Sequence, residues 1–384
     1  MREAPARAGQ RMHVLFCNWR DTRNPEGGGS ERYVESMARG LVAEGHRVTI
    51  ACAAHGHAPP DEVVDGIRFV RRGTKLDIYL RTFLALLLGR YGKVDVVVDV
   101  QNGLPFFTRL ATRKPVVVLV HHVHREQWPV VYPGLIGTIG WWIESRFAPV
   151  LYRHCQYVAV SIATKLELIE LGVDGDRIAI IHNGNDPAPV AGVLRSPTPR
   201  ICVVGRLVPH KQVEHAIDAV AAMAADHPDL VLDVIGAGWW DEELRAYAVA
   251  RGVLDRVVFH GFVDGTRKHE LLAQSWVMAL PSLKEGWGIV VGEAGGHATP
   301  TVAYSTAGGT TESIDHKDTG LLVDTPAQLT AALRDLIEDR ELREFLGRGA
   351  LAKSFTFSWE SSQQAFSRVV TAAAAGRRPA RIRA

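Results

Sequence analysis

The runs VVVDV at residues 96–100 and VVVLV at residues 116–120 decide the fold class of this chain. Neither run alternates between polar and apolar residues. A strand with one face in water alternates, whereas a parallel strand buried on both faces is continuously apolar. Amphipathic segments such as residues 30–44 and 161–171 separate runs of this kind. The pattern therefore predicts repeated βα units and an α/β fold with doubly wound parallel sheets.

The same rhythm continues through two halves of the chain. The strand-like runs of the first half are residues 13–18, 47–52, 94–100, 115–122, 156–161 and 178–182, and those of the second half are residues 201–204, 231–235, 257–260, 277–280, 301–303 and 320–323. Residues 183–199 interrupt the rhythm with four prolines and two glycines, which is typical of a linker. Residues 335–348 are strongly helical, and residues 359–373 form a last amphipathic stretch before a basic tail.

These features predict two Rossmann-like domains that face each other across a cleft. The first covers residues 1–188, the second covers residues 189–358, and residues 376–384 form the tail. The carboxyl ends of parallel strands carry the ligands in such folds, so the cleft is the expected functional site.

Composition narrows the class of protein. The chain has 384 residues, which exceeds the usual limit of one hydrophobic core, and its 47% hydrophobic content is that of a globular protein. Its net charge of +2 gives no reason to expect nucleic acid as a partner.

Four scattered cysteines, in or beside apolar runs, predict buried thiols in a reducing compartment. We see no signal peptide and no membrane span of roughly 18 apolar residues, so we expect a cytoplasmic protein.

Three glycines, Gly27, Gly28 and Gly29, follow the first strand and open a helix. Glycine lets the backbone approach a ligand closely, and a helix N-terminus favours an anion. The spacing is not that of a dinucleotide-binding fingerprint, and a plain βα loop explains the glycines equally well.

Arg206 and Lys211 follow the first strand of the second domain, and we expect Arg206 to end that strand and Lys211 to begin the next helix. Two cations at a strand-to-helix junction favour binding of a diphosphate. Solvated surface charges are the weaker alternative.

Glu285 and Glu293 enclose seven residues, among them Gly286, Trp287, Gly288 and Ile289. A carboxylate accepts hydrogen bonds from sugar hydroxyls, and a second one further along a helix can bind a ribose diol. Amides at the helix start between them would face phosphate. Glu293 could equally be an exposed helix residue, which is harder to argue for Glu285.

His121, His122 and His124 end an apolar run. Their alternation and the lack of neighbouring cysteines argue against a zinc site. We expect His121 to hydrogen-bond a substrate and His122 and His124 to be satisfied surface residues.

In their order along the chain, these motifs resemble the retaining glycosyltransferases of family 4, which have the GT-B fold. The resemblance rests on GGGSE at residues 27–31, LVHH at 119–122, GRLVPHK at 205–211, HGFVD at 260–264 and EGWGIVVGE at 285–293. It covers nearly the whole chain. The departures are Trp287, where the family often has Phe, and Gln212, where it often has Gly; neither removes a charge.

The resemblance implies a role for each motif. Gly28 and Gly29 would approach the donor diphosphate, which Arg206 and Lys211 would neutralise. Glu285 would contact the transferred sugar, Glu293 the ribose, Val263 the base, and His121 the reacting sugar. The helix at residues 359–375 would cross back onto the first domain.

The expected activity is retaining transfer of a hexose from a nucleotide sugar, either GDP-mannose or a UDP-hexose, to a glycan, lipid or small-molecule acceptor. No Asp-x-Asp motif stands at a strand end, so we expect neither metal nor cofactor. The alternatives are a sugar-nucleotide epimerase, an inverting glycosyltransferase or a non-catalytic nucleotide-sugar-binding protein. A Rossmann oxidoreductase is more distant, because Gly236 and Gly238 form only part of its glycine pattern.

An apolar surface is the last feature. Leu80, Phe83, Leu84, Leu87 and Leu88 share a helical spacing, with Arg81, Arg90 and Lys93 nearby, while Trp128, Tyr132, Ile136, Trp141 and Trp142 lie in a segment poor in charge. Basic amphipathic helices and interfacial aromatics bind anionic membranes. Leu84, Leu87 and Leu88 could instead be ordinary core contacts. Peripheral association with the inner face of the cell membrane and a lipid-linked acceptor of the cell envelope are the corresponding expectations.

Overall fold

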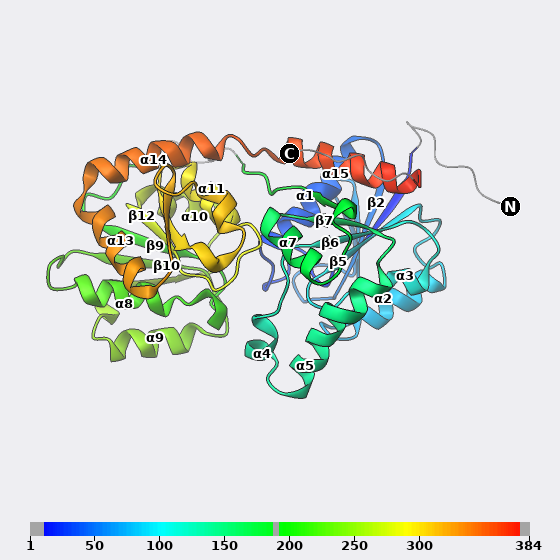
Figure 1. Cartoon of the computed structure of the whole chain (residues 1–384), viewed down its shortest axis with the longest axis horizontal. Coiled ribbons are helices and arrows are strands. Elements are labelled where there is room, and N and C mark those ends of the chain that lie inside the picture. Colours follow the sequence, from blue (N-terminus) through cyan, green and yellow to red (C-terminus); the bar gives the residue numbers. More distant parts are fainter. Residues whose placement is uncertain (1–10, 187–191, 377–384) are drawn as a thin grey trace. The chain divides into compact units, whose positions relative to one another are not determined.

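A computed structural model describes residues 11–186 and 192–376. The chain divides into two compact units, which we describe separately (Figure 1). Unit 1 is Met1–Asn183 together with Trp359–Ala384, and unit 2 is Gly184–Ser358. The boundary expected at residues 188 and 189 and the tail at 377–384 lie outside the described residues.

Unit 1 is built on an eight-stranded sheet in the order β3-β4-β2-β1-β5-β6-β7-β8. All neighbouring strands are parallel except the antiparallel pair β3 and β4. The strands are β1 His13–Cys17, β2 Arg47–Cys52, β3 Asp61–Val64, β4 Ile67–Arg71, β5 Val96–Gln101, β6 Val116–Val120, β7 Gln156–Ala159 and β8 Ile178–Ile180. Strands β1, β5 and β6 are buried along their whole length, as expected for continuous apolar runs.

The hairpin of β3 and β4 was not predicted from the sequence. Its two strands are joined by Asp65 and Gly66, both with positive φ angles of 51° and 77°. Such a two-residue turn matches the twist of an antiparallel pair. An Asp-Gly pair between β-branched residues is a signal that could have revealed this hairpin.

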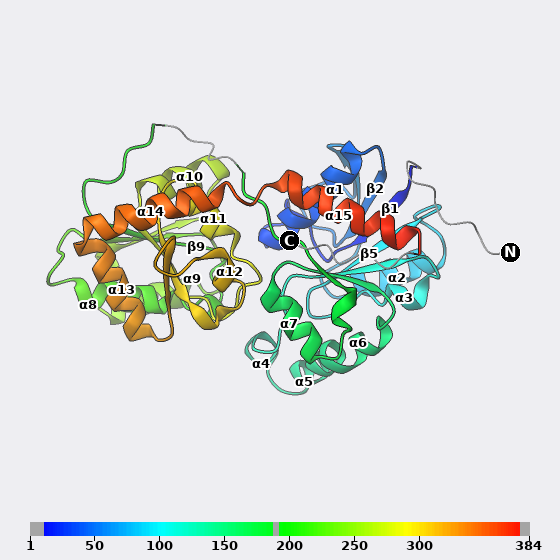
Figure 2. The same ribbon diagram turned by 45° about the horizontal axis from the view of Figure 1, so that its top comes forward.

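Helices cover both faces of this sheet. Helix α1 (Gly29–Ala43) packs against α15 (Trp359–Ala374), and Phe366 of α15 stacks on Phe16 of β1 with ring centroids 5.9 Å apart (Figures 1 and 2). The C-terminal helix therefore belongs to unit 1. The alternate residues Leu15 and Cys17 face a core with residues of α2, α3, α6 and α7. The remaining helices of unit 1 are α2 Ile78–Leu87, α3 Thr108–Ala111, α4 Gln127–Val131, α5 Leu135–Trp142, the π-helix η1 Ile143–Phe147, α6 Ala148–Leu151, α7 Ile162–Glu170 and the 3-10 turn η2 Gly175–Arg177.

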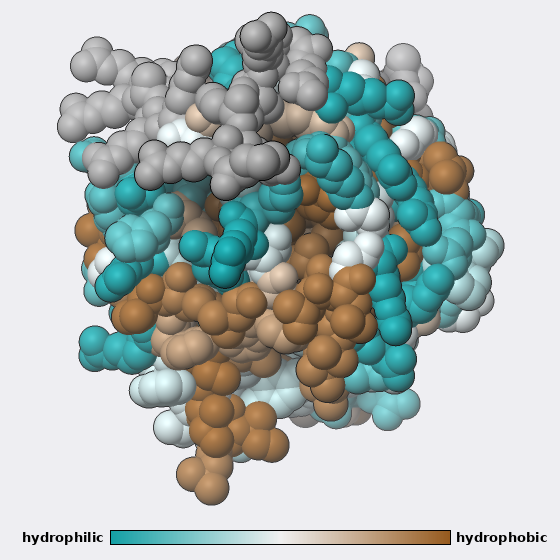
Figure 3. Space-filling view, turned by 90° about the vertical axis from the view of Figure 1, so that its right-hand side faces the viewer, coloured by the Kyte–Doolittle hydropathy of each residue, from teal (hydrophilic) through white to brown (hydrophobic). Residues whose placement is uncertain are grey.

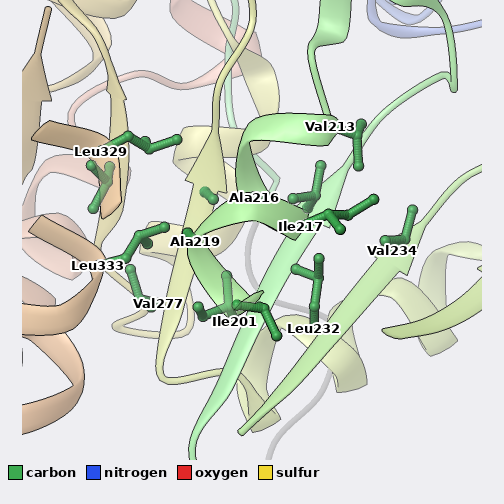
Figure 4. Close-up of a cluster of buried hydrophobic side chains, with 14 of the residues drawn as sticks. Ile201, Val213, Ala216, Ile217, Ala219, Leu232, Val234, Val277, Leu329 and Leu333 are labelled. Carbon is green, nitrogen blue, oxygen red and sulfur yellow. The ribbon is translucent and has the colours of Figure 1, made fainter. Parts of the chain in front are cut away.

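Unit 2 has a six-stranded parallel sheet in the order β11-β10-β9-β12-β13-β14. One face packs under α8 and α13, where Ile217 and Leu333 meet Ile201 of the central strand (Figure 4). The opposite face buries Cys202 and Val204 against α10 and α11. The strands are β9 Arg200–Val204, β10 Val231–Ile235, β11 Val257–Gly261, β12 Val277–Leu280, β13 Thr301–Tyr304 and β14 Gly320–Val323.

One of two helical expectations for unit 2 is confirmed and one is wrong. Residues 335–348 are helical except at Asp339, which ends α13 (Pro326–Glu338) and caps α14 (Arg340–Ser354) by accepting the amide of Leu342 at 2.9 Å. Lys211 does not begin a helix but ends a 3-10 turn, η3. The helical segments before α13 are η3 Pro209–Lys211, α8 Glu214–Met223, α9 Asp241–Ala250, η4 Leu254–Arg256, α10 Gly265–Gln274, α11 Ile289–Gly295, η5 Ser305–Ala307 and α12 Thr310–Ser313.

Each sheet reverses its strand order at one point. In unit 1 the reversal lies between β1 and β5, and in unit 2 it lies between β9 and β12. The loops that leave such neighbouring strands diverge, so a crevice opens at their carboxyl ends. The motifs GGGSE, GRLVPHK and EGWGIVVGE all follow one of these four strands.

The other predicted features of the chain can be placed as well. All four cysteines are buried and unpaired. No helix in residues 11–186 and 192–376 combines the length and the apolar character that crossing a bilayer requires.

Candidate active site

A recess lies at the strand reversal of unit 2. It is lined by Gly205, Arg206 and Lys211 after β9 and by Pro281 and Ser282 after β12. Arg206 lies two residues beyond the strand and does not end it. Backbone contact holds the two loops together, since the amide of Leu283 donates to the carbonyl of His210 at 2.9 Å. The two predicted cations therefore share one recess.

Lys211 pairs with Glu285 inside unit 2. Its Nζ lies 2.5 Å from Glu285 Oε1, and both side chains are largely shielded from water. The Glu285 backbone is fixed on both sides, because its amide donates to Ala307 and its carbonyl accepts from Gly309. The sequence motifs around residues 211 and 285 thus meet in space as a cation–carboxylate pair.

Sequence reasoning missed a polar group in this recess. Ser282 is buried, and its Oγ has no hydrogen-bond partner among the described residues. A buried hydroxyl normally has a partner, so an unpaired one beside two cations is suited to a ligand. The only sequence signal was its position two residues after a buried strand.

Glu293 lies in α11 and is not an exposed helix residue. Its side chain is buried, and Oε1 accepts from Nζ of Lys268 at 2.6 Å. Lys268 belongs to α10, and no local pattern in the sequence connects it with Glu293. Both glutamates of the motif therefore have a lysine partner.

The residues between the two glutamates have different roles in the structure. Gly288 has a φ of 84°, a conformation that favours glycine, and α11 begins at Ile289. Trp287 is buried and meets Phe357 edge to face at 4.8 Å. Gly286 lies very close to Gly309. A side chain at position 309 would collide with the carbonyl oxygen of Gly286. We expect Trp287 to position this loop through packing.

Two further positions belong to the predicted donor site. Val263, expected near the base, is half-buried against the core around Cys202 and Val204. Gln212 has a φ of 48°, a left-handed conformation that favours glycine. Gly236 and Gly238 pack against Gly205 and Leu207, so they serve a tight turn.

In unit 1 the glycine loop is fixed by a buried carboxylate. Glu31 is fully buried, accepts the amide of Gly28 at 2.7 Å and pairs with Arg20 at 2.9 Å. A side chain at Gly28 would meet only Glu31, at 3.8 Å, so protein packing does not demand glycine there. Gly29 begins α1. Open space at Gly28 is consistent with a ligand that approaches the backbone.

A second buried network holds the start of the same loop. The Asp21 carboxylate is fully shielded and lies 2.5 Å from Arg71 Nε and 2.9 Å from His55 Nε2. Arg71 also contacts Glu62 at 2.8 Å. These charges come from β3, β4 and two loops, and no local sequence pattern indicates that they meet.

His121 follows β6 directly and is buried. Tyr33 of α1 meets its ring edge to face at 5.4 Å. Burial lowers the pKa of His121 to about 4. The negative charge of Glu31 raises this pKa, but its effect is smaller than that of burial. His121 is therefore neutral at pH 7, and its Nε2 has no partner among the described residues.

This burial predicts a measurable pH dependence of stability. The unfolded chain binds a proton at His121 below its ordinary pKa of about 6.5, but the folded chain resists protonation down to about pH 4. Stability is therefore lost as the pH falls through this window. Between pH 7 and pH 5 the free energy of unfolding should fall by about 2 kcal/mol more in the wild type than in His121→Asn, measured by urea denaturation. Equal slopes in the two proteins would contradict the assignment.

His122 and His124 are half-buried, not surface residues. His122 lies 3.0 Å from the amide oxygen of Gln127, and His124 lies 3.1 Å from buried Glu144. Both have a side-chain partner within unit 1, whereas the buried Nε2 of His121 has none among the described residues.

Unpaired buried polar atoms gather at the carboxyl end of the unit 1 sheet. Besides His121 Nε2 they are Asn18 Oδ1 after β1, Gln101 Oε1 at the end of β5 and Asn102 Nδ2 beyond it. Amides and a neutral imidazole are suited to hydrogen bonds with hydroxyl groups. The sequence analysis identified His121 alone of this set.

The described residues contain no group of three or more His, Cys, Asp or Glu side chains placed to hold a metal ion. Asp99 of the DVVVD run is buried in β5, where it accepts from Thr108 Oγ1 at 2.7 Å and from the Phe106 amide at 2.9 Å. Its role is to fix the loop after β5.

Comparison with known proteins identifies the class of this molecule. The family model described as Glycosyltransferase Family 4 matches residues 27–188, and that described as Glycosyl transferases group 1 matches residues 189–352. Sucrose-phosphate synthase of Thermosynechococcus elongatus is structurally similar, with a TM-score of 0.77 at 18% identity over 92% of this chain and 97% of that one. Anabaena HepE, solved in complex with UDP-glucose, has a TM-score of 0.72 at 21% identity over 93% and 98%. The fold is GT-B.

The sequence relatives assign the family. D-inositol 3-phosphate glycosyltransferase of Acidothermus cellulolyticus is 32% identical over 92% of this chain and 88% of its own length. Glycogen synthase of Mycobacterium tuberculosis is 25% identical over 96% of both chains. The chain belongs to the group 1 glycosyltransferases of family 4, and it is an enzyme that transfers sugar from a nucleotide-sugar donor.

Proposed function

We propose that this enzyme transfers a hexose from a UDP-hexose or GDP-mannose with retention of anomeric configuration and without a metal ion. The acceptor is a glycan, a lipid or a small molecule. The observation that carries the proposal is the recess of unit 2, where Arg206, Lys211 and Ser282 lie at the strand reversal and Lys211 holds Glu285 at 2.5 Å.

The chemical demand of the reaction fits these groups. When a nucleoside diphosphate leaves an anomeric carbon, negative charge grows on its outer phosphate and the sugar becomes oxocarbenium-like. Fixed cations stabilise the growing charge without reorganisation at the moment of reaction. Arg206 and Lys211 are the cations we assign to this role, and the Ser282 hydroxyl adds a hydrogen-bond donor.

The two glutamates fit the polar parts of the donor. We assign Glu285 to hydroxyls of the transferred sugar and Glu293 to the ribose diol. Each lysine holds its glutamate by Oε1, and carboxylate oxygens accept hydrogen bonds from hydroxyl groups. Lys268 is then a positioning residue for Glu293.

Unit 1 supplies the groups we assign to the reacting sugar and the acceptor. As a neutral imidazole, His121 can exchange a hydrogen bond with a sugar hydroxyl but does not serve as an acid at pH 7. We assign Gly28 and Gly29 to the donor diphosphate, in line with the family resemblance. The unpaired amide atoms Asn18 Oδ1, Gln101 Oε1 and Asn102 Nδ2 are suited to acceptor hydroxyls.

Two measurements test the reaction type. Nucleotide release from UDP-glucose and GDP-mannose should persist after exhaustive EDTA treatment, because protein cations stabilise the leaving group. With a panel of soluble sugars and alkyl glycosides as acceptors, NMR should show the donor's anomeric configuration in the product. Activity that returns only with Mg²⁺ or Mn²⁺ would refute metal independence.

The same experiment separates the alternatives. A product of opposite configuration would indicate an inverting enzyme, and a changed sugar nucleotide without acceptor would indicate an epimerase. Binding without turnover for every donor would indicate a non-catalytic protein.

We further place the enzyme in the cytoplasm, peripheral to the inner face of the cell membrane, where it would act on envelope glycans. Four buried, unpaired cysteines are typical of a reducing compartment. Neither a cofactor nor nucleic acid enters this proposal.

A further inference from the structure

An exposed apolar face on unit 1 is the strongest feature that the active site does not use. Helix α2 buries Ile78, Thr82 and Leu86, so its core stripe is complete. Its other leucines face outward, with Leu80 61% and Leu87 54% exposed. The interpretation of Leu84, Leu87 and Leu88 as core contacts is therefore wrong.

The exposed residues lie on helices of unit 1 that ring contacts connect. Helix α2 packs against α3, where Tyr79 stacks on Phe106 at 4.6 Å and Leu110 is exposed. From the start of α3, Phe107 contacts Phe147 of η1 at 6.1 Å, and Phe147 contacts Trp142 of α5 at the same distance. We call this surface the leucine face; its exposed members are Leu76, Leu80, Leu84, Leu87, Leu88, Leu110, Leu135, Ile136, Ile139, Trp142, Phe147 and Val150.

Figure 3 looks onto this end of unit 1 and shows apolar side chains in a band and on a protruding segment below it. A patch of this kind exceeds the scattered apolar residues of an ordinary surface. Trp128, expected to belong to this surface, does not, because it is buried against Gly140 and donates to Glu144 at 2.6 Å.

The surroundings of the leucine face are basic. Residues 76–154 contain nine Arg and Lys but five Asp and Glu. Two of the five acids, Asp99 and Glu144, are buried. Exposed cations include Arg90, Lys93 and Arg109. An anionic bilayer has negatively charged headgroups above apolar acyl chains. Exposed apolar residues in a segment with excess positive charge complement both layers.

A recess opens where α2 ends. It has a volume of about 170 Å³ and is lined by Leu86, Gly89, Tyr91, Gly92, Lys93, Val94, Thr112 and Lys114. The two lysines of this recess can bind a phosphate group. Leu87 and Leu88, which are exposed, provide apolar surface next to them. The recess lies at the amino ends of β5 and β6, whereas His121 follows the carboxyl end of β6. It is therefore separate from the predicted reaction site within unit 1.

We propose that the leucine face binds the surface of an anionic bilayer, with the leucines among the acyl chains and a lipid phosphate in the recess of Lys93 and Lys114. This inference rests on the peripheral location proposed above. It does not depend on the donor, the acceptor or the stereochemistry. Vesicle binding and donor turnover can therefore fail independently.

The test is sedimentation of the full chain with vesicles of equal parts phosphatidylglycerol and phosphatidylcholine, compared with phosphatidylcholine alone. Leu80→Ser/Leu87→Ser should reduce the partition coefficient at least about tenfold, because two half-exposed leucines lose their insertion. The matched control Val249→Ser/Phe345→Ser changes two residues of unit 2 that are 60% and 50% exposed, and it should bind like the wild type.

The recess is tested by charge. Lys93→Ala/Lys114→Ala should lower binding to anionic vesicles by about tenfold or more and should remove most of its salt dependence. Arg340→Ala/Arg348→Ala removes two exposed cations of unit 2 and should have no effect. Nucleotide release without vesicles should be unchanged in all four variants, which shows that they remain folded.

Several results would overturn the proposal. The proposal is wrong if the wild-type protein stays in solution with anionic vesicles at low salt. It is also wrong if the matched controls lose as much binding as the leucine and lysine variants. Self-association abolished by the leucine substitutions would instead identify an interface between copies. As a second measurement, brominated lipid should quench Trp142 fluorescence, and the quenching should be reduced in Trp142→Phe.

Discussion

Lys211→Ala is expected to lower kcat/KM by about two orders of magnitude, and Arg206→Ala by one to two. A charge-assisted contact is worth roughly 1.5–3 kcal/mol, and about 1.4 kcal/mol is a factor of ten in rate. Lys211 should matter more, because its loss also leaves the Glu285 carboxylate without its cation at the recess. Steady-state kinetics with the preferred donor measures both effects.

Lys353 offers a matched control. It pairs with Asp315 in unit 2 at 2.6 Å, a geometry close to that of Lys211 with Glu285, but it does not line the recess. Lys353→Ala should leave kcat/KM within about twofold of the wild type. Wild-type turnover and nucleotide affinity in both Lys211→Ala and Arg206→Ala would refute the diphosphate assignment.

Arg71→Met is expected to lower the free energy of unfolding by about 3–5 kcal/mol. Arg71 and Asp21 are both shielded from water, so removing the cation leaves a buried carboxylate without its guanidinium partner. Asp21 fixes the loop that leads to Gly28, so donor turnover should fall as well. Urea denaturation gives the stability, and nucleotide release gives the turnover.

The neighbouring residue provides the comparison. Arg72 also pairs with an aspartate, Asp61, but both side chains are about half exposed. An exposed ion pair contributes at most about 1 kcal/mol, so Arg72→Met should change stability little. If the two substitutions had equal cost, the buried network would not be what holds the glycine loop.

The sequence predicted the strands well where burial on both faces dictates composition. All twelve predicted strands exist, because parallel strands between helices must be apolar throughout. The hairpin of β3 and β4 escaped because β3 is short and mostly exposed, and because Arg68 and Arg71 interrupt the apolar signal of β4. The helical prediction for residues 335–348 holds, but the break between α13 and α14 was not visible because one capping aspartate, Asp339, does not interrupt the helical pattern.

The sequence predicts those residues of the candidate site that lie together in short motifs. Arg206, Lys211, Glu285 and Glu293 lie in short segments beside strands, where position alone indicates exposure to a crevice. Lys268 and Ser282 could not be found this way. Lys268 reaches Glu293 from a different helix, and the unpaired state of Ser282 depends on what surrounds it in three dimensions.

The route of the chain through unit 1 affects how it is made. Helix α15 covers Phe16 and packs on α1, yet about 175 residues of unit 2 separate it from the rest of unit 1. At a ribosomal rate of roughly 5–20 residues per second, the face that receives α15 stays uncovered for about 10–40 seconds during synthesis. Unit 2 can fold once its last helices, α13 and α14, have emerged, whereas unit 1 must wait for α15. A nascent chain stalled before residue 359 should therefore expose apolar surface on its first half, and chaperones would be expected to bind there.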